Sequence, residues 1–114
     1  MKCRLGFSGG EQASGDLIFE NGNFTVKYIL DGDVCSLEYK NGALVQRRCG
    51  SVCLTLEFKE DCESKCVIGG GELRGELPVF CERLKISVLD DRVYIFLEYL
   101  LGGEKTALDI NIIY

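Results

Sequence analysis

The stretch LIFENGNFTVKYILDGDVCSLEYKNGAL, residues 17–44, determines the expected fold of this chain. Three X-Gly pairs, Asn21-Gly22, Asp31-Gly32 and Asn41-Gly42, separate runs in which apolar and polar side chains alternate. Pairs of this kind favour two-residue type I′ hairpin loops, because both central residues need a positive φ. The stretch therefore predicts consecutive antiparallel strands joined by tight turns.

These turns also predict which residues face each other across each hairpin. The expected pairs are Leu17 and Val26, Phe19 and Phe24, Tyr28 and Cys35, Val26 and Leu37, Tyr39 and Leu44, Leu37 and Gln46, and Cys35 and Arg48. With this register, one face of the sheet collects apolar side chains and the other collects mostly polar ones. Turn chemistry and hydrophobic period agree, so the sheet has a predictable inside and outside.

Further turns extend the pattern to the C-terminus. Cys49-Gly50-Ser51 is predicted as a three-residue loop, with Gly50 available for the left-handed position. This loop keeps four residues on the inner face: Val52, Leu54, Leu56 and Phe58. A strand over 62–68 is expected to end at the glycine run 69–71.

Residues 76–88 are predicted to form one long strand, within which the alternation of apolar and polar residues shifts by one position. One phase contains Leu77, Val79 and Cys81, and the other contains Leu84, Ile86 and Val88. A β-bulge near Glu82-Arg83 would bring both sets to the same face. The last hairpin is expected to turn at Gly102-Gly103, with these residues inside: Val93, Ile95, Leu97, Tyr99, Leu108, Ile110 and Ile112.

The predicted fold class is therefore all-β, with a single domain over residues 1–114 and eight to ten strands. A regular antiparallel meander favours closure into a barrel, because closure removes the exposed sheet edges. A two-sheet β-sandwich is the alternative. A barrel of this size holds either packed side chains or one small ligand.

Composition restricts the class of protein. The net charge is −5 and the cationic residues are scattered, which argues against nucleic acid as a partner. No run approaches the roughly 18 apolar residues of a membrane span, and the start of the chain lacks the apolar region of a signal peptide. We therefore expect a cytoplasmic protein whose seven cysteines are free thiols.

Several motifs resemble those of the YwiB-like proteins, a bacterial family of unknown function. They are Leu44-Val45, Arg48-x-Gly50-x-Val52, Phe58, Gly75-Glu76-Leu77 and Ile95-x-Leu97-x-Tyr99. The resemblance covers most of residues 15–114. It implies a calycin-like barrel of the lipocalin type, and it carries no established activity, cofactor or catalytic residue. The chain differs from the family in its many cysteines, its short N-terminus and its Gly69–Gly71 insertion.

The residues favour no enzymatic or metal site. The absence of histidine removes the Ser-His-Asp and Cys-His arrangements. Two cysteine pairs, Cys49-x3-Cys53 and Cys62-x3-Cys66, superficially resemble zinc ligands. Strand alternation sends Cys53 outward and Cys62 and Cys66 inward, so we predict no metal site, no catalytic residue and no cofactor.

The predicted ligand site consists of Arg48, Gln46, Tyr28 and Tyr99 on the inner face. A buried guanidinium must be paired, and its planar fork suits a carboxylate or phosphate. The hypothesis is a small acidic, amphipathic ligand with its head at Arg48 and its tail along Leu37, Leu54 and Leu97. The alternative places Arg48 at the barrel rim, paired with Asp33.

A second hypothesis concerns the outer face. If Val93, Ile95 and Leu97 face inward, then Tyr94, Phe96 and Leu100 face outward. An apolar outer row is typical of an oligomer contact, so a homodimer is predicted as a possible assembly. In this alternative the barrel is solid and the protein is a structural or interaction module without ligand or catalysis.

Overall fold

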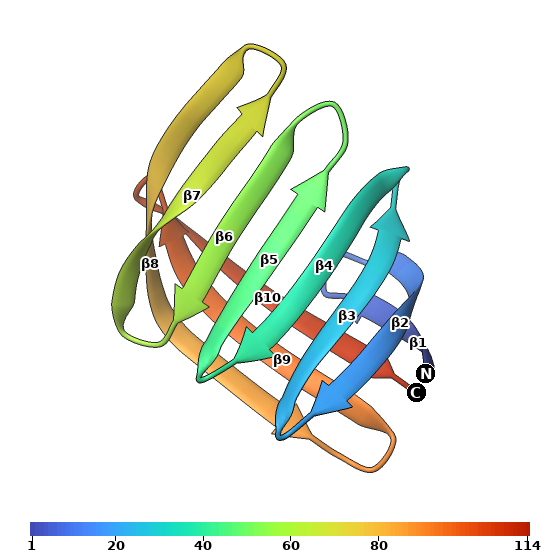
Figure 1. Ribbon diagram of the computed structural model, residues 1–114. Helices are drawn as coiled ribbons and strands as arrows, with labels where there is room; N and C mark the ends of the chain where they lie inside the picture. The colour runs from blue at the N-terminus through green and yellow to red at the C-terminus, as the bar shows by residue number, and fades with distance from the viewer.

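The computed structural model confirms that the chain is an all-β antiparallel meander closed into a barrel (Figure 1). It describes residues 1–114, apart from the side chain of Leu73. Each strand pairs with the next one along the chain, and β1 pairs with β10. The strands are β1 (Lys2–Phe7), β2 (Gln12–Glu20), β3 (Asn23–Leu30), β4 (Asp33–Lys40), β5 (Ala43–Cys49), β6 (Cys53–Lys59), β7 (Cys62–Gly70), β8 (Leu73–Val88), β9 (Arg92–Leu101) and β10 (Glu104–Ile113).

The three decisive turns have the conformation that their sequences predict. Asn21, Asp31 and Asn41 have φ angles of 50°, 51° and 53°, and the glycines that follow them have φ angles of 80° to 82°. Both central residues of each turn thus lie in the left-handed region, as a type I′ turn requires. Every residue pair predicted across these hairpins is observed.

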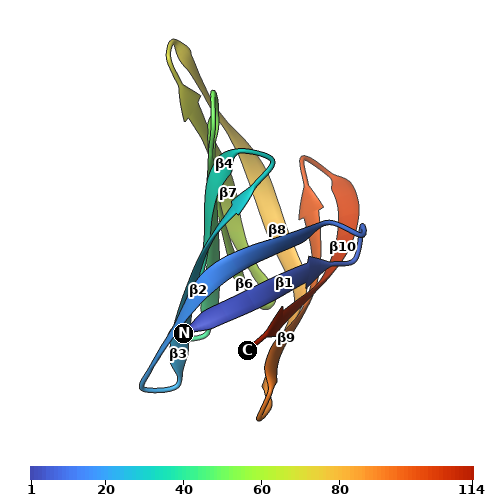
Figure 2. The ribbon, with the colours of Figure 1, turned by 90° about the vertical axis from the view of Figure 1, so that its right-hand side faces the viewer.

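Strand β8 changes partner along its length and bends the sheet. Its first half pairs with β7 and its second half with β9. The register shifts between Cys81 and Arg83, which confirms the predicted bulge. Because a bulge increases local twist, β8 can pass from one side of the barrel to the other. Figure 2 shows the result, a flattened barrel with β3–β7 in one layer and β9 and β10 in the other.

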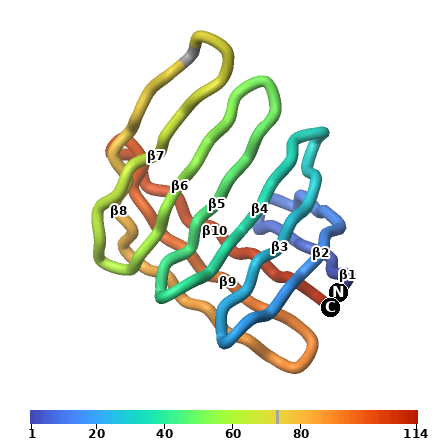
Figure 3. The backbone as a smooth tube through the Cα atoms, viewed as in Figure 1, coloured from blue at the N-terminus to red at the C-terminus, as the bar shows by residue number. Residues whose placement is uncertain are grey.

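The chain ends lie side by side (Figure 3), because the start of β1 pairs with the end of β10. This pairing closes the sheet. Among the described residues, no helix is long and apolar enough to cross a membrane.

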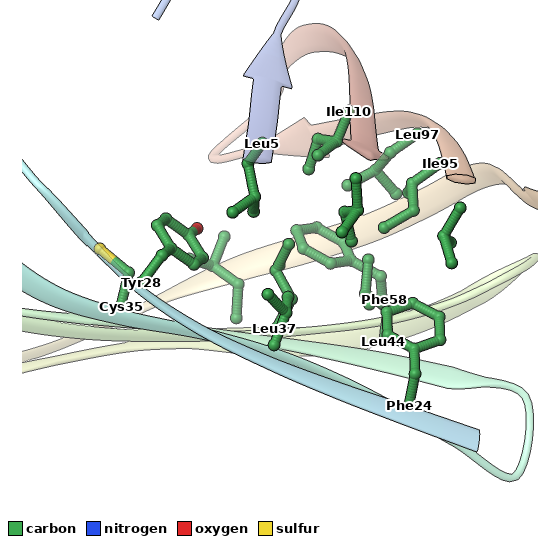
Figure 4. Packing of buried hydrophobic residues seen from close by; sticks show 14 of the residues in the cluster. Leu5, Phe24, Tyr28, Cys35, Leu37, Leu44, Phe58, Ile95, Leu97 and Ile110 are labelled. Atoms are coloured by element: carbon green, nitrogen blue, oxygen red, sulfur yellow. The ribbon is translucent and has the colours of Figure 1, made fainter. Parts of the chain in front are cut away.

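The centre of the barrel is filled by apolar side chains from both layers (Figure 4). The most deeply buried are Leu17, Val26, Leu37, Leu44, Phe58, Val93, Ile95 and Ile112. Apart from Tyr28 and the cysteines, all buried side chains that the structure describes are purely apolar. Some residues of the inner face are nevertheless exposed, among them Phe19, Leu77 and Val88.

The β5–β6 connection differs from the prediction by one residue. Cys49 pairs with Cys53, so the loop is Gly50–Val52 and Gly50 does not adopt a positive φ. Val52 lies in this loop and is exposed, not on the inner face. The backbone N–H of Gly50 donates to the carbonyl of Val52 at 3.1 Å, which closes the loop without a left-handed glycine. Leu56 and Phe58 keep the predicted inner face.

Two further expectations are corrected. Gly69 and Gly70 continue β7, and the turn comes after them at Gly71-Glu72. Not all seven cysteines are free, because Cys49 and Cys53 form a disulfide across the outer face of the β5–β6 hairpin. The pairing of these two residues directly opposite each other brings their sulfurs together. The other five are free thiols.

Candidate functional site

Three of the predicted ligand residues line one pocket at the end of the barrel. This pocket, called here the Arg48 pocket, has a volume of about 340 Å³. Tyr28 comes from β3, and Gln46 and Arg48 come from β5. The full lining is Phe7, Ser8, Gly9, Glu11, Tyr28, Leu30, Cys35, Gln46, Arg48, Ala107 and Leu108. The pocket therefore lies where β3–β5 approach the β1–β2 loop and β10.

Arg48 lies at the rim of this pocket and is already paired. Its Nε donates to Oδ2 of Asp33 at 2.7 Å, and its Nη2 lies 4.0 Å from Oδ2 of Asp31. The Arg48 side chain is 36% exposed. The expectation of a guanidinium enclosed inside the barrel is therefore wrong, because β5 ends one residue later and the long side chain reaches the mouth. The alternative, a rim arginine paired with Asp33, is what the structure shows.

The mouth of the Arg48 pocket carries more negative than positive charge. Asp31 and Asp33 flank the guanidinium of Arg48, and Glu11 also lines the pocket. The pKa of Arg48 is raised, mainly by its hydrogen bond to Asp33. The guanidinium therefore stays charged. The nearest cation is thus balanced by carboxylates of the protein itself, while Nη1 and Nη2 retain N–H groups that can donate to a ligand.

Tyr28 forms the floor of the pocket. It is 4% exposed, and its ring lies 5.8 Å from that of Phe7. Burial raises the pKa of Tyr28 to about 12, and the Cys35 thiol and Glu11 add to this, whereas Gln46 and Arg48 oppose it. The phenol is therefore neutral at physiological pH and can both donate and accept a hydrogen bond.

The fourth predicted ligand residue, Tyr99, does not line the Arg48 pocket. Its ring packs against Phe58, with 4.8 Å between ring centroids. Tyr99 lies on β9 opposite Cys81 and Thr106, and burial raises the pKa of its phenol. The inner face was predicted correctly here, but strand parity alone does not show which inner residues share a pocket.

Of the three residues predicted along the ligand tail, Leu37 and Leu97 are enclosed in the core, whereas Leu54 is half-buried beside it. Leu37 and Leu97 are 0% and 1% exposed and pack within the central core. Figure 4 shows both side chains within the cluster of buried apolar side chains that also contains Phe58 and Ile95. This part of the interior is therefore occupied by side chains of the protein itself.

The predicted oligomer row is only partly exposed. Tyr94, Phe96 and Leu100 are half-buried, and the hydroxyl of Tyr94 donates to Oδ1 of Asp109. Charged residues interrupt the row: Phe96 lies between Lys85 and Asp109, and Leu100 pairs with Lys105.

The cysteines do not converge on one point. Cys49 and Cys53 are joined on the outer face, whereas Cys66 is buried in the core. Among the residues that the structure describes, no group of three or more Cys, Asp or Glu side chains is arranged to hold a metal ion.

Sequence analysis missed the wall of the pocket contributed by the β1–β2 loop and β10. Ser8, Gly9 and Glu11 belong to a glycine-bearing turn, which is the same signal that located the other hairpins. The turn could have been recognised from that signal. Its place in the same pocket as Arg48 could not be recognised from the sequence, because it depends on how the barrel closes.

Comparison with known proteins identifies a similar fold. No protein-family model matches the chain, and no curated protein matches it. The crystal structure of the YwiB protein from Bacillus subtilis is similar, with a TM-score of 0.73 over 97% of this chain and 87% of that chain. The sequence identity is 11%, so the likeness supports a YwiB-like fold and carries no residue roles.

Proposed function

We propose that this protein is a binding barrel for a small amphipathic molecule that occupies the Arg48 pocket. The observation that carries this proposal is the convergence of Tyr28, Gln46 and Arg48 on one open pocket at the end of an otherwise filled barrel. Small-molecule sites are typically concave and mostly apolar, with a few polar groups that fix orientation. The Arg48 pocket combines apolar residues such as Phe7 and Leu30 with the polar groups of Tyr28, Gln46 and Arg48, although its lining is about as polar as it is apolar.

The size of the pocket limits the ligand. Its volume of about 340 Å³ lies near the lower end for ligand pockets, which is on the order of 300 Å³. It is about twice the cavity that holds one benzene, on the order of 150 Å³. A compact molecule with a short apolar part fits this space, and a long acyl chain does not.

The charges at the mouth limit the head group. Arg48, Gln46 and the neutral Tyr28 all offer hydrogen-bond donors, so the head must contain an acceptor. Asp31, Asp33 and Glu11 repel an added carboxylate. We therefore favour an uncharged acceptor as the head group, such as an amide carbonyl, over the acidic head group that the sequence predicted.

The test is a titration with matched pairs of small aliphatic and aromatic amides and carboxylic acids, followed by NMR chemical shifts of the labelled protein. We expect the amides to shift the resonances of Tyr28 and Gln46 more strongly than the acids do. Arg48→Ala should weaken that binding at least tenfold, about 1.4 kcal/mol. Arg47→Ala is the matched control, because Arg47 is exposed on the outer face of the same strand.

Two results would remove the proposal. One is the absence of any shift in the pocket residues for either series. The other is binding that Arg48→Ala and Arg47→Ala reduce equally. If the acids bind better than the amides, the pocket stands and our assignment of the head group is wrong.

We also infer that the chain is a distant YwiB-like protein with a calycin-like barrel of the lipocalin type, located in a bacterial cytoplasm. The fold similarity and the motifs around Arg48 and Ile95-x-Leu97-x-Tyr99 support this inference. Fractionation of a cell that produces the protein would test the location. Recovery in the membrane or extracellular fraction would contradict it.

The alternative is a solid interaction module that dimerises through Tyr94, Phe96 and Leu100. The filled centre of the barrel favours this alternative. Sedimentation velocity at micromolar concentration provides the test, with Phe96→Glu as the disrupting variant. A monomeric wild-type protein would exclude this dimer.

A further inference from the structure

The outer surface carries a cysteine pair that differs from every other cysteine of the chain. Cys49 is exposed and Cys53 is half-buried, and both project from the outer face of the β5–β6 hairpin. They lie directly opposite each other, with 4.1 Å between their Cα atoms, and form a disulfide. This pair has no place in the Arg48 pocket, which lies on the inner face.

We propose that Cys49 and Cys53 are a site of reversible thiol–disulfide exchange with small disulfides of the glutathione type. In the oxidising direction, the thiolate of Cys49 attacks one sulfur of the small disulfide and releases the first small thiolate. The thiolate of Cys53 then attacks the Cys49 sulfur of the mixed disulfide and releases the second. The protein loses two electrons and two protons, and the small disulfide becomes two thiols.

Position favours this chemistry, because the pairing of β5 with β6 places Cys49 and Cys53 directly opposite each other. The loop between them is fixed on both sides. Gly50 is in such close contact with the Asp33 carboxylate that a Cβ there would overlap it. On the other side, a Cβ at Gly70 would lie 2.7 Å from the Ser51 carbonyl oxygen. Reacting groups that are held together in this way behave as if highly concentrated, so closure of the mixed disulfide is favoured over a second small thiol.

Accessibility separates this pair from the four buried cysteines. Cys3, Cys35, Cys66 and Cys81 are 5%, 2%, 3% and 1% exposed. Burial raises the pKa of all four thiols, that of Cys81 to about 11, so little of the reactive thiolate forms. Cys62 is half-buried on the inner side, opposite Cys81.

The surroundings suit an anionic small disulfide. Arg47 is exposed and projects from the same outer face, two residues before Cys49. Arg74 pairs with Gly69, which in turn pairs with Cys53, so a second arginine follows in the same row of the sheet. The disulfide closes a ring with a sequence separation of only 4, where cross-linking constrains the unfolded chain least. An exchange site explains its exposed position better than a structural cross-link does.

The test uses the full chain in buffers with graded ratios of reduced to oxidised glutathione. After acid quenching, free thiols are alkylated and the modified peptides are identified by mass spectrometry. We expect the Cys49 and Cys53 peptides to change together from alkylated to disulfide-bonded as the ratio falls, while the other five cysteines remain thiols.

One variant traps the mixed disulfide, and a second variant serves as the control. Cys53→Ser should retain one glutathione on Cys49, because the second attack is removed. Cys62→Ser is the matched control and should titrate like the wild type. The proposal is wrong if the pair stays oxidised or stays reduced across the whole series, or if Cys62 and Cys81 react first. The wild-type titration decides these outcomes even if a variant fails to fold.

Discussion

Asp33 links the Arg48 pocket to the β5–β6 loop through two contacts of its carboxylate. Oδ2 accepts a hydrogen bond from Arg48 at 2.7 Å, and Oδ1 abuts Gly50. Both partners lie on the same hairpin, so the carboxylate is held in one orientation. A side chain at position 50 would displace Asp33 and release the guanidinium that it orients.

Gly50→Ala should therefore weaken both folding and the pocket. The overlap with Asp33 and the lost ion pair should lower the free energy of unfolding by about 1–2 kcal/mol. Urea unfolding measures this change, and amide titration of the variant measures the effect on the pocket. Gly69→Ala is the control, because a Cβ there meets no atom within 4 Å. Equal effects of the two substitutions would contradict the contact with Asp33.

The ionisation of Tyr28 makes the free energy of unfolding depend on pH under alkaline conditions. Its pKa rises from 10.0 to about 12 on folding, mainly through burial. Below pH 10 the phenol is protonated in both the folded and unfolded states, so it adds no pH dependence. Between pH 10 and about 12 only the unfolded state loses the proton, and stability falls by about 1.4 kcal/mol per pH unit.

Tyr28→Phe should remove the part of the pH dependence of unfolding that comes from the phenol proton of Tyr28. We expect wild-type stability to fall more steeply than that of the variant between pH 10 and 11.5, by about 1.4 kcal/mol per unit. Urea unfolding at several pH values measures both slopes. Other groups that titrate in this range act equally in both proteins, so parallel slopes would show that Tyr28 ionises normally in the folded state.

Strand β2 contains a glycine that the neighbouring strand requires. A Cβ at Gly15 would lie 2.5 Å from the carbonyl oxygen of Lys27 and 3.1 Å from Cβ of Tyr28. Both obstacles belong to β3 close to its backbone, so they cannot move as a flexible side chain could. Gly15 thus lets β2 lie close to β3 where it also pairs with β1.

Gly15→Ala should lower the free energy of unfolding by about 2–3 kcal/mol, the cost of overpacking against backbone. Gly6→Ala in β1 is the control, because a Cβ there meets no atom within 4 Å. That substitution should be neutral, or stabilising by up to about 1 kcal/mol through the unfolded chain. Chemical unfolding of the two variants compares them, and a neutral Gly15→Ala would contradict the close approach of the strands.

Strand β8 shows how far a pattern can locate an irregularity. The apolar phase slips between Cys81 and Leu84, and the register shift lies between Cys81 and Arg83. The alternation of side chains along a strand reveals a bulge, because one extra residue exchanges the two faces of the strand. The glycine run carried no such constraint, so Gly69 and Gly70 could continue β7 although a break was expected there.

The barrel is filled at its centre and open at the end where Arg48 lies. Leu37 is fully buried among side chains of both layers. Leu37→Ala should lower the free energy of unfolding by about 2–5 kcal/mol and leave an apolar cavity. Such a cavity should bind benzene, whereas the wild-type centre should not.

Urea unfolding and NMR titration with benzene check this prediction. Ile18→Ala is the control for lost apolar surface, because Ile18 is 60% exposed. Benzene bound in the centre of the wild-type barrel would show that the interior is not filled.

The sequence predicts the strand pairs of the first hairpins, the inner and outer faces, the bulge in β8 and the antiparallel meander, whereas it leaves open whether the meander closes into a barrel or folds into a sandwich. The predicted features are local properties, because an Asx-Gly turn and the alternation of side chains act over a few neighbouring residues. Four features follow from the folded barrel instead: Arg48 reaches the rim, Tyr99 packs on Phe58, Glu11 lines the pocket, and Cys49 forms a disulfide with Cys53. Each of those depends on loop closure and on which strands face each other across the flattened barrel, and neither is encoded in the period of a single strand.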